Sequence, residues 1–249
     1  MTLASKESFA HGPAMSDTHL TEAKKPDSAP DFRGLNAWVF DLDYTLYTTD
    51  AAEQAQMEER ICLYVQNHYG LARDAAWEVQ KAYLRDYGST LAGLVHNENI
   101  DADAYHEVIN DIEVLDLKPD TALRTGMKRL PGQRFVFTNN DGRFAAEVLT
   151  RLGIRDLFAG IVDARAMNFV PKPKQAAYDT LLAQTGLDPR RAVLFDDSPR
   201  NLVPAKALGM KTVWFNNGLG QSAAKIERPE LHIDHQTDNL AHFLQTIRI

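Results

Sequence analysis

The fold is decided by residues 38–47, which read WVFDLDYTLY. The first three residues are large and apolar, as in a strand that is buried on both faces of a sheet. This run stops at Asp41, and a second carboxylate, Asp43, follows two places later. A buried strand that ends in Asp-x-Asp delivers acids to the edge of a parallel sheet, where such folds place their binding sites. Taken alone, the same pattern also fits a solvated strand end followed by a turn.

The part of the chain after residue 117 alternates between strand and helix patterns. Apolar runs that predict strands lie at 134–137, 161–162, 192–195 and 211–215, with the last strand at 211–215. Amphipathic segments separate them, and the links are short. Strands and helices that alternate in this way form right-handed crossovers and a parallel sheet covered on both faces. We therefore expect an α/β fold, a doubly wound, Rossmann-like parallel sheet.

A helical insertion of about 70 residues interrupts this pattern directly after the first strand. Residues 49–117 contain amphipathic helical segments and no convincing strand. The core is then made of 34–48 and 118–249. Residues 1–33 are polar, contain Ser, Pro, Lys and Asp, and have no apolar segment, so we expect a disordered extension.

Composition narrows the classes of function. The 249 residues are 44% hydrophobic, enough for a full core, and carry a formal net charge of −7, which argues against a nucleic-acid partner. The one cysteine, Cys62, allows no disulfide within the chain and suits a reducing, cytoplasmic setting. No apolar run is long enough to span a bilayer, so we expect no membrane partner. Both a monomer and a homodimer remain open.

Polar clusters follow three of the predicted strands, at ends that share one edge of a doubly wound sheet. They are Asp41 with Asp43, Thr138 with Asn139, and Asp196 with Asp197. A cation, Lys172, lies between two prolines that stiffen its loop. Carboxylates about 4 Å apart repel by about 4 kcal/mol at an effective dielectric near 20, so the cluster calls for a cation. A set of oxygen ligands favours a hard divalent cation such as Mg²⁺.

In this order, the motifs resemble those of the haloacid dehalogenase superfamily of phosphohydrolases. The resemblance covers residues 38–201 and includes Asn201 after the third cluster. It implies that Asp41 is the nucleophile that forms an aspartyl-phosphate, and that Asp43 is the general acid and base. It also implies a phosphate site made of Thr138, the backbone N–H of Asn139, and Lys172. Lys174 is the rival of Lys172, although the spacing to the following helix favours Lys172.

The same resemblance implies the metal ligands. Asp41, the backbone carbonyl of Asp43, and Asp197 would hold Mg²⁺, with Asp197 as the family's metal carboxylate. Asp196 would be a second ligand or would hold a metal-bound water. Family dehalogenases need no acid two places after the nucleophile, so Asp43 favours phosphate chemistry. The insertion at 49–117 matches the family's small α-helical cap, which closes over the site.

A narrower resemblance is to the pyrimidine 5′-nucleotidases of this superfamily. It is carried by residues 87–94 (YGSTLAGL), 137–140 (FTNN) and 195–201 (FDDSPRN). We expect residues 87–94 to form a flexible loop in which Tyr87 stacks on the base while Ser89 and Thr90 reach polar groups of the leaving group. Helices that carry Trp77 and Tyr83 would crowd the pocket and reject the larger purines.

The expected function is thus Mg²⁺-dependent hydrolysis of a small phosphorylated metabolite, first of all a pyrimidine nucleoside monophosphate. Three alternatives remain open from the sequence. One is a phosphatase of a small sugar phosphate or of phosphoglycolate, and another is a phosphomutase, which has the same motifs. The third is a binding protein that uses the fold as a scaffold without catalysis.

Overall fold

The computed structural model describes residues 29–110, 116–216, 218 and 231–249. In this part of the chain, six parallel strands form one sheet in the order β3-β2-β1-β4-β5-β6. The strands are β1 (Ala37–Phe40), β2 (Gln133–Phe137), β3 (Gly160–Val162), β4 (Ala192–Asp196), β5 (Lys211–Phe215) and β6 (His235–Thr237). The strand β1 lies in the middle, hydrogen-bonded to β2 on one side and to β4 on the other. The strand β6 was not predicted, so 211–215 is not the last strand.

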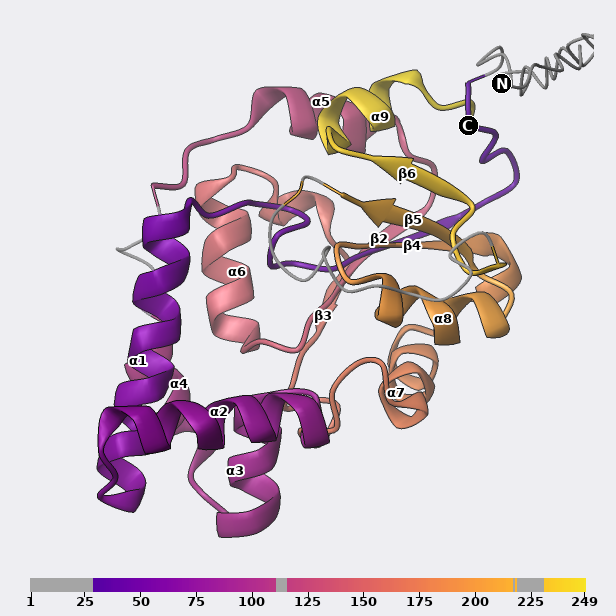
Figure 1. The fold of residues 1–249 in the computed structure, drawn as a ribbon. Coiled ribbons are helices and arrows are strands. Elements are labelled where there is room, and N and C mark those ends of the chain that lie inside the picture. The colour runs from indigo at the N-terminus through magenta and orange to yellow at the C-terminus, as the bar shows by residue number, and fades with distance from the viewer. Residues whose placement is uncertain (1–28, 111–115, 217, 219–230) are drawn as a thin grey trace, which may run out of the picture.

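Helices cover both faces of the sheet, as Figure 1 shows. They are α5 (Thr121–Arg129), α6 (Gly142–Arg151), α7 (Gln175–Thr185), α8 (Pro199–Ala207) and α9 (Leu240–Thr246), with short 3₁₀ turns at Arg155–Leu157 and Pro189–Arg191. In β1, Trp38 and Phe40 pack with α5, α6 and α9, whereas Val39 packs with α7 and α8 on the other face. This alternation follows from the two-residue period of a strand. The predicted doubly wound α/β fold is confirmed.

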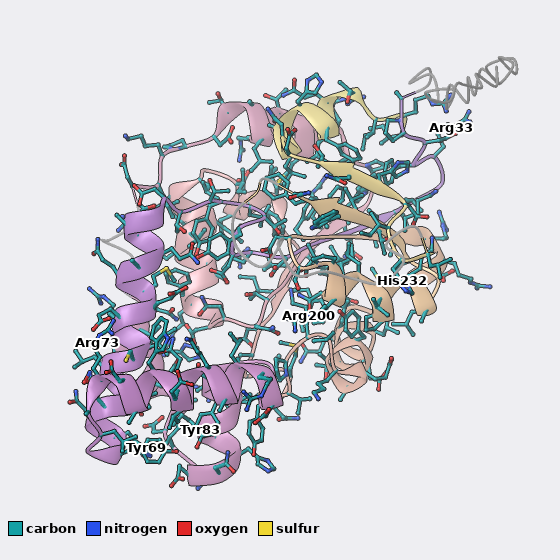
Figure 2. The ribbon with its side chains drawn as sticks, in the orientation of Figure 1. Arg33, Tyr69, Arg73, Tyr83, Arg200 and His232 are labelled. Atoms are coloured by element: carbon teal, nitrogen blue, oxygen red, sulfur yellow. The ribbon has the colours of Figure 1, made fainter. Side chains whose placement is uncertain are left out.

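The insertion forms a helical unit beside the sheet (Figure 1). It contains α1 (Ala51–Tyr69), α2 (Arg73–Tyr87), α3 (Thr90–Glu98) and α4 (Ala102–Ile109), and we call it the cap. Its own core includes Cys62, Val65 and Leu94. The hydroxyls of Tyr69 and Tyr83, labelled in Figure 2, are 2.6 Å apart and join α1 to α2. Across the described segments, no helix is both long and apolar enough to cross a membrane.

The prediction of a loop at residues 87–94 is wrong, because most of this stretch forms the first half of α3. The Ser89 side chain accepts a hydrogen bond from the Ala92 N–H at 3.0 Å and caps this helix. A Cβ built on Gly93 would lie 2.3 Å from the Tyr83 ring, so only glycine lets α3 approach α2 this closely. The glycine that suggested flexibility is therefore a helix-packing residue.

The boundary of the N-terminal extension also needs correction. Phe32 was expected in the disordered segment, but its side chain is fully buried and packs against Trp38 and Phe243. Its N–H donates to the Arg248 carbonyl at 2.8 Å, which ties this segment to the end of the chain. A single aromatic residue in a polar stretch gave no periodicity from which its burial could be predicted. Residues 1–28 lie outside the described part.

Phe32→Ala should therefore destabilise the protein by about 3–5 kcal/mol, because it empties a large core position. Arg33→Ala, next to it but exposed, should cost less than about 1 kcal/mol. Chemical unfolding followed by circular dichroism measures both. Similar stabilities for the two variants would mean that Phe32 is not part of the core.

Candidate active site

Asp41 directly follows the central strand. Its backbone N–H donates to the Phe195 carbonyl at 2.8 Å, so the residue continues the pairing of β1 with β4. The side chain is 7% exposed, and its Oδ1 accepts from the Leu42 N–H at 2.7 Å and from Lys172 Nζ at 2.8 Å. Both contacts are on one oxygen, and no residue in the described ranges donates to Oδ2. The carboxylate is thus fixed by one oxygen and presents the other.

Lys172 connects the ends of three strands. Its buried ammonium lies 2.8 Å from Asp41 Oδ1 and 2.8 Å from Asp196 Oδ2, and donates to the Phe137 carbonyl at 2.7 Å. Burial opposes its charge, but the two carboxylates outweigh burial and raise the pKa of Lys172. Lys174 is exposed and comes directly before α7. The structure therefore brings Lys172, and not Lys174, to the carboxylates.

Asp196 lies at the end of β4 and has no exposed surface. Besides Lys172, it accepts from the Ser198 N–H at 2.9 Å and from Asn201 Nδ2 at 2.8 Å. Burial and the neighbouring charge of Asp41 nevertheless raise the pKa of Asp196 to about 7. Burial is the larger cause of this rise, and the neighbouring carboxylate of Asp41 adds an excess of negative charge.

A metal ion fits this excess. Oxygens of Asp41, Asp196 and Asp197 lie within 4.8 Å of one another, and with Lys172 these groups leave a formal charge of −2 when ionised. Next to them, the buried hydroxyl of Ser198 has no partner among the described residues. An all-oxygen donor set and an unpaired buried hydroxyl suit a hard divalent cation with its bound water. The buried aspartate cluster can therefore hold a metal.

Asp43 has a different environment, although it is only two residues from Asp41. Its Oδ1 accepts from the Tyr47 hydroxyl at 2.5 Å, and Asn140 Nδ2 approaches its carboxylate at 3.4 Å. Burial raises the pKa of Asp43, and these two hydrogen bonds oppose the rise. A raised pKa favours the protonated carboxyl, which is the form that a general acid needs. Tyr47 and Asn140 lie inside the stretches 38–47 and 137–140 quoted from the sequence, but no role was predicted for either.

The predicted phosphate-binding pair lies at the end of β2. The Asn139 side chain accepts from the Lys172 N–H at 2.8 Å and donates to the Lys172 carbonyl at 3.3 Å, so it fixes the lysine loop. Thr138 is fully buried, and its hydroxyl accepts from the Asn140 N–H at 3.0 Å. Asn139 lines the site pocket described next, and Thr138 is not among the residues that line it.

Two cavities meet at Asp43. A pocket of about 300 Å³, the site pocket, is lined by Asp41, Asp43, Lys172 and Asp197, and by Arg200 at the start of α8 (Figure 2). A second cavity of about 550 Å³, the cap cavity, lies between cap and core. The residues that line both include Asp43, Tyr44 and Asn139. Asp43 therefore lines both the site pocket and a cavity of a size that suits a small ligand.

The cap residues predicted from sequence separate into two groups. Ser89 and Thr90 line the cap cavity. Tyr87 lines neither cavity, because its hydroxyl donates to Asn97 at 3.1 Å and its ring packs on Tyr83 and His96. Tyr87 thus belongs to the packing of α2 on α3. The aromatic residues that line the cap cavity include Trp77 and Tyr105 instead.

Polar contacts hold α4 of the cap against the core. Asn110 Nδ2 donates to Asn140 Oδ1 at 2.9 Å, so the amide beside Asp43 is also held from the cap. Asp103 pairs with Arg143 at 3.0 Å and with Arg165. None of these contacts was predicted, because they join residues far apart in the sequence.

Comparison with known proteins identifies the family. The sequence model of the haloacid dehalogenase-like hydrolases matches residues 35–209. The chain belongs to this family. The match runs from just before β1 to just after α8 and so contains every clustered residue described above. This haloacid dehalogenase-like hydrolase is therefore an enzyme of the class that its motifs resemble.

Individual relatives are more distant. Phosphate metabolism protein 8 of Saccharomyces cerevisiae is 28% identical over 220 residues, which cover 82% of this chain and 68% of the yeast protein. The structure of a HAD phosphatase from Thermococcus onnurineus has a TM-score of 0.57 at 16% identity, covering 86% of this chain and all of that one. CbbY from Rhodobacter sphaeroides, solved with xylulose-(1,5)bisphosphate, gives 0.58 at 20% identity, covering 83% and 95%. The two structures share the fold.

Lys172→Ala should lower kcat by about 10²–10³-fold or more, because it removes the one ammonium that contacts Asp41. Lys174→Ala should produce the smaller loss, since this lysine is exposed and makes no contact with the carboxylates in the described structure. Steady-state kinetics of phosphate release under saturating Mg²⁺ measures both. A larger loss for the Lys174 variant would contradict the placement of Lys172.

Stability should depend on pH and Mg²⁺ together. Asp196 binds its proton more tightly in the folded protein (pKa about 7) than in the unfolded chain (about 3.8), so the metal-free fold loses stability as pH rises between these values. Mg²⁺ offsets the repulsion between the carboxylates that are ionised at the higher pH. Saturating Mg²⁺ should therefore raise Tm more at pH 8 than at pH 5.5, measured by thermal unfolding.

Asp197→Asn is the control for this experiment, because it removes a metal carboxylate while Asp196 and Lys172 keep their contacts. The Mg²⁺-dependent rise in Tm should largely disappear in this variant. Equal Mg²⁺ effects at the two pH values would contradict the assignment of Asp196 as a titrating neighbour of the metal.

Proposed function

We propose that this haloacid dehalogenase-like hydrolase is a Mg²⁺-dependent phosphomonoesterase that acts on nucleoside 5′-monophosphates, pyrimidine nucleotides first. One observation carries the proposal. Asp43 lies where the site pocket and the cap cavity meet, which is where the bridging oxygen of a phosphomonoester would lie. The phosphoryl group would then face Asp41 and Lys172, with the leaving group in the cap cavity.

In the first half of the reaction, Asp41 Oδ2 attacks phosphorus and forms an aspartyl-phosphate while the phosphorus–oxygen bond to the leaving group breaks. Asp43 gives its proton to the departing oxygen. In the second half, Asp43 takes a proton from water, and the water oxygen attacks phosphorus. Inorganic phosphate leaves and the Asp41 carboxylate is restored.

Fixed charges and donors lower the barrier of both halves. Lys172 keeps its ammonium beside the attacked phosphoryl group, and the Thr138 hydroxyl and the Asn139 N–H supply further donors. Asp41, the Asp43 carbonyl and Asp197 would hold Mg²⁺, with Asp196 behind them. When bound, the ion neutralises charge that develops on the phosphoryl oxygens.

The size and lining of the cap cavity support a nucleoside as the leaving group. Its walls combine apolar and aromatic side chains such as Met57, Trp77 and Tyr105 with a few polar ones. This mixture suits a base and a ribose. With Tyr87 packed elsewhere, we assign contact with the base to Trp77 or Tyr105. CbbY, solved with a sugar bisphosphate, makes a sugar phosphate the natural competing substrate to test.

The test compares UMP and CMP with AMP, GMP, ribose 5-phosphate and p-nitrophenyl phosphate, with and without Mg²⁺. We expect kcat/KM to be higher for UMP and CMP than for the other esters, by about 10–200-fold for discrimination by shape. Chelation of Mg²⁺ should abolish all turnover. Asp41→Asn should leave less than about 1% of activity, since it removes the nucleophile.

Different results would separate the parts of this proposal. Full activity of the Asp41→Asn variant would contradict the assignment of Asp41 as the nucleophile. A sugar phosphate that is hydrolysed faster than UMP would end the nucleotidase assignment and leave the phosphatase assignment in place.

A further inference from the structure

Gln80 is a buried residue of the cap, and in the described structure it lines the cap cavity. The proposed mechanism gives its carboxamide no role. It lies on α2 with Trp77 three places before it and Leu84 four places after it, and both also line the cavity. Residues at this spacing share one face of a helix. That face of α2 thus presents Trp77 and Leu84 with the Gln80 carboxamide between them, and Lys81 lies next to Gln80 on the lining.

The carbonyl oxygen of the Gln80 carboxamide has no hydrogen-bond partner in the described part of the chain. The residue is 9% exposed, and its buried Oε1 accepts from no group there. A buried amide without a partner destabilises the fold, and a leucine or methionine would fill similar space without that loss. An unpaired amide at the wall of a cavity is explained if the group that enters the cavity pairs with it.

Neighbouring groups indicate what kind of ligand this would be. His106 and Thr90 are the other buried polar residues of the wall, and burial lowers the pKa of His106, so its ring is neutral at pH 7. Asn110 Nδ2 lies 3.1 Å from His106 Nδ1 and so already engages this ring. Besides Asp43, the lining carries two charged groups, Glu58 and Lys81, which contact Gln54 and Glu78 respectively. The buried part of the wall therefore suits a neutral, hydrogen-bonding group.

We propose that Gln80 is the specificity-determining residue of the cap cavity and that its carboxamide binds the hydrogen-bonding edge of the nucleobase. The inference rests on the proposed nucleotidase function. A carboxamide offers a donor and an acceptor side by side. Uracil presents N–H beside C=O, and cytosine presents a ring nitrogen beside an amino group. A half-turn of the amide matches either edge, so Gln80 serves UMP and CMP alike.

The test is Gln80→Leu, which keeps the volume and removes the hydrogen bonds. Its kcat/KM for UMP and for CMP should fall by about 10–100-fold, as expected for the loss of a paired amide. Ribose 5-phosphate carries the same phosphate and sugar without a base, so its kcat/KM should change by less than about 3-fold. Gln80→Met, which is unbranched, is the second variant if leucine disturbs α2.

A readout without substrate separates this role from simple packing. Because Gln80 is unpaired in the free enzyme, Gln80→Leu should raise Tm by about 2–4 °C while it lowers turnover of nucleotides. Gln56→Leu is the matched control, since Gln56 is an exposed glutamine of α1. This variant should change neither the Tm nor the ratio of UMP to ribose 5-phosphate by a comparable amount.

The outcomes distinguish the two proposals. If the native enzyme shows no preference for UMP over ribose 5-phosphate, both the nucleotidase function and the role of Gln80 are overturned. If the native enzyme prefers UMP and both Gln80 variants keep that preference, only the role of Gln80 is overturned. Loss of the preference in the Gln80 variants, with unchanged turnover of ribose 5-phosphate, supports both.

Discussion

The pairing of one buried ammonium with two carboxylates is the constraint on which the site depends. Lys172 contacts Asp41 from β1 and Asp196 from β4, and its own loop is fixed by Asn139 from the end of β2. An unpaired lysine could not stay charged at this depth. The ends of three neighbouring strands must therefore converge, and the order β2-β1-β4 within the sheet makes them converge.

This pairing leaves more negative than positive charge in the site, and that excess defines the chemistry. One ammonium does not balance the three carboxylates of Asp41, Asp196 and Asp197 when all are ionised, so the cluster can hold a cation. Asp43 stands apart from that cluster and is held by Tyr47 and Asn140 instead. Two carboxylates two residues apart thus have different environments, one beside the Lys172 ammonium and the other beside Tyr47 and Asn140. The separation of acid and nucleophile roles by environment is common in enzymes that use two carboxylates.

The sequence was informative where function is encoded by local spacing. Asp41, Asp43, Lys172 and the 196–197 pair each lie at or near a strand end, so a correct strand prediction also placed them at one edge. The errors arose where tertiary packing decided the structure. Residues 87–94 were expected to form a loop, but Gly93 packs α3 closely against Tyr83 of α2, and Phe32 lies in a segment too short to show a period.

Residues recruited by the fold could not be found from motifs. Tyr47 and Asn140 act on Asp43 by proximity, and Asn110 reaches Asn140 from a different domain. Gln80 gave one weak sign, a polar residue on the apolar stripe of α2. Such a residue is distinguished from an ordinary surface position only when burial and the lack of a partner are known.

Asp43 lines both the site pocket and the cap cavity, and in the proposed reaction this placement also sets the order in which the products depart. Attack on the aspartyl-phosphate must come in line, from the side opposite Asp41, which is the side through which the first alcohol left. In the proposed reaction, water reaches phosphorus only after the cap cavity empties, so the nucleoside leaves first and phosphate last. Any other hydroxyl compound that enters the cap cavity in that interval competes with water as acceptor. The balance between hydrolysis and phosphoryl transfer is then a property of cap occupancy rather than of the catalytic residues.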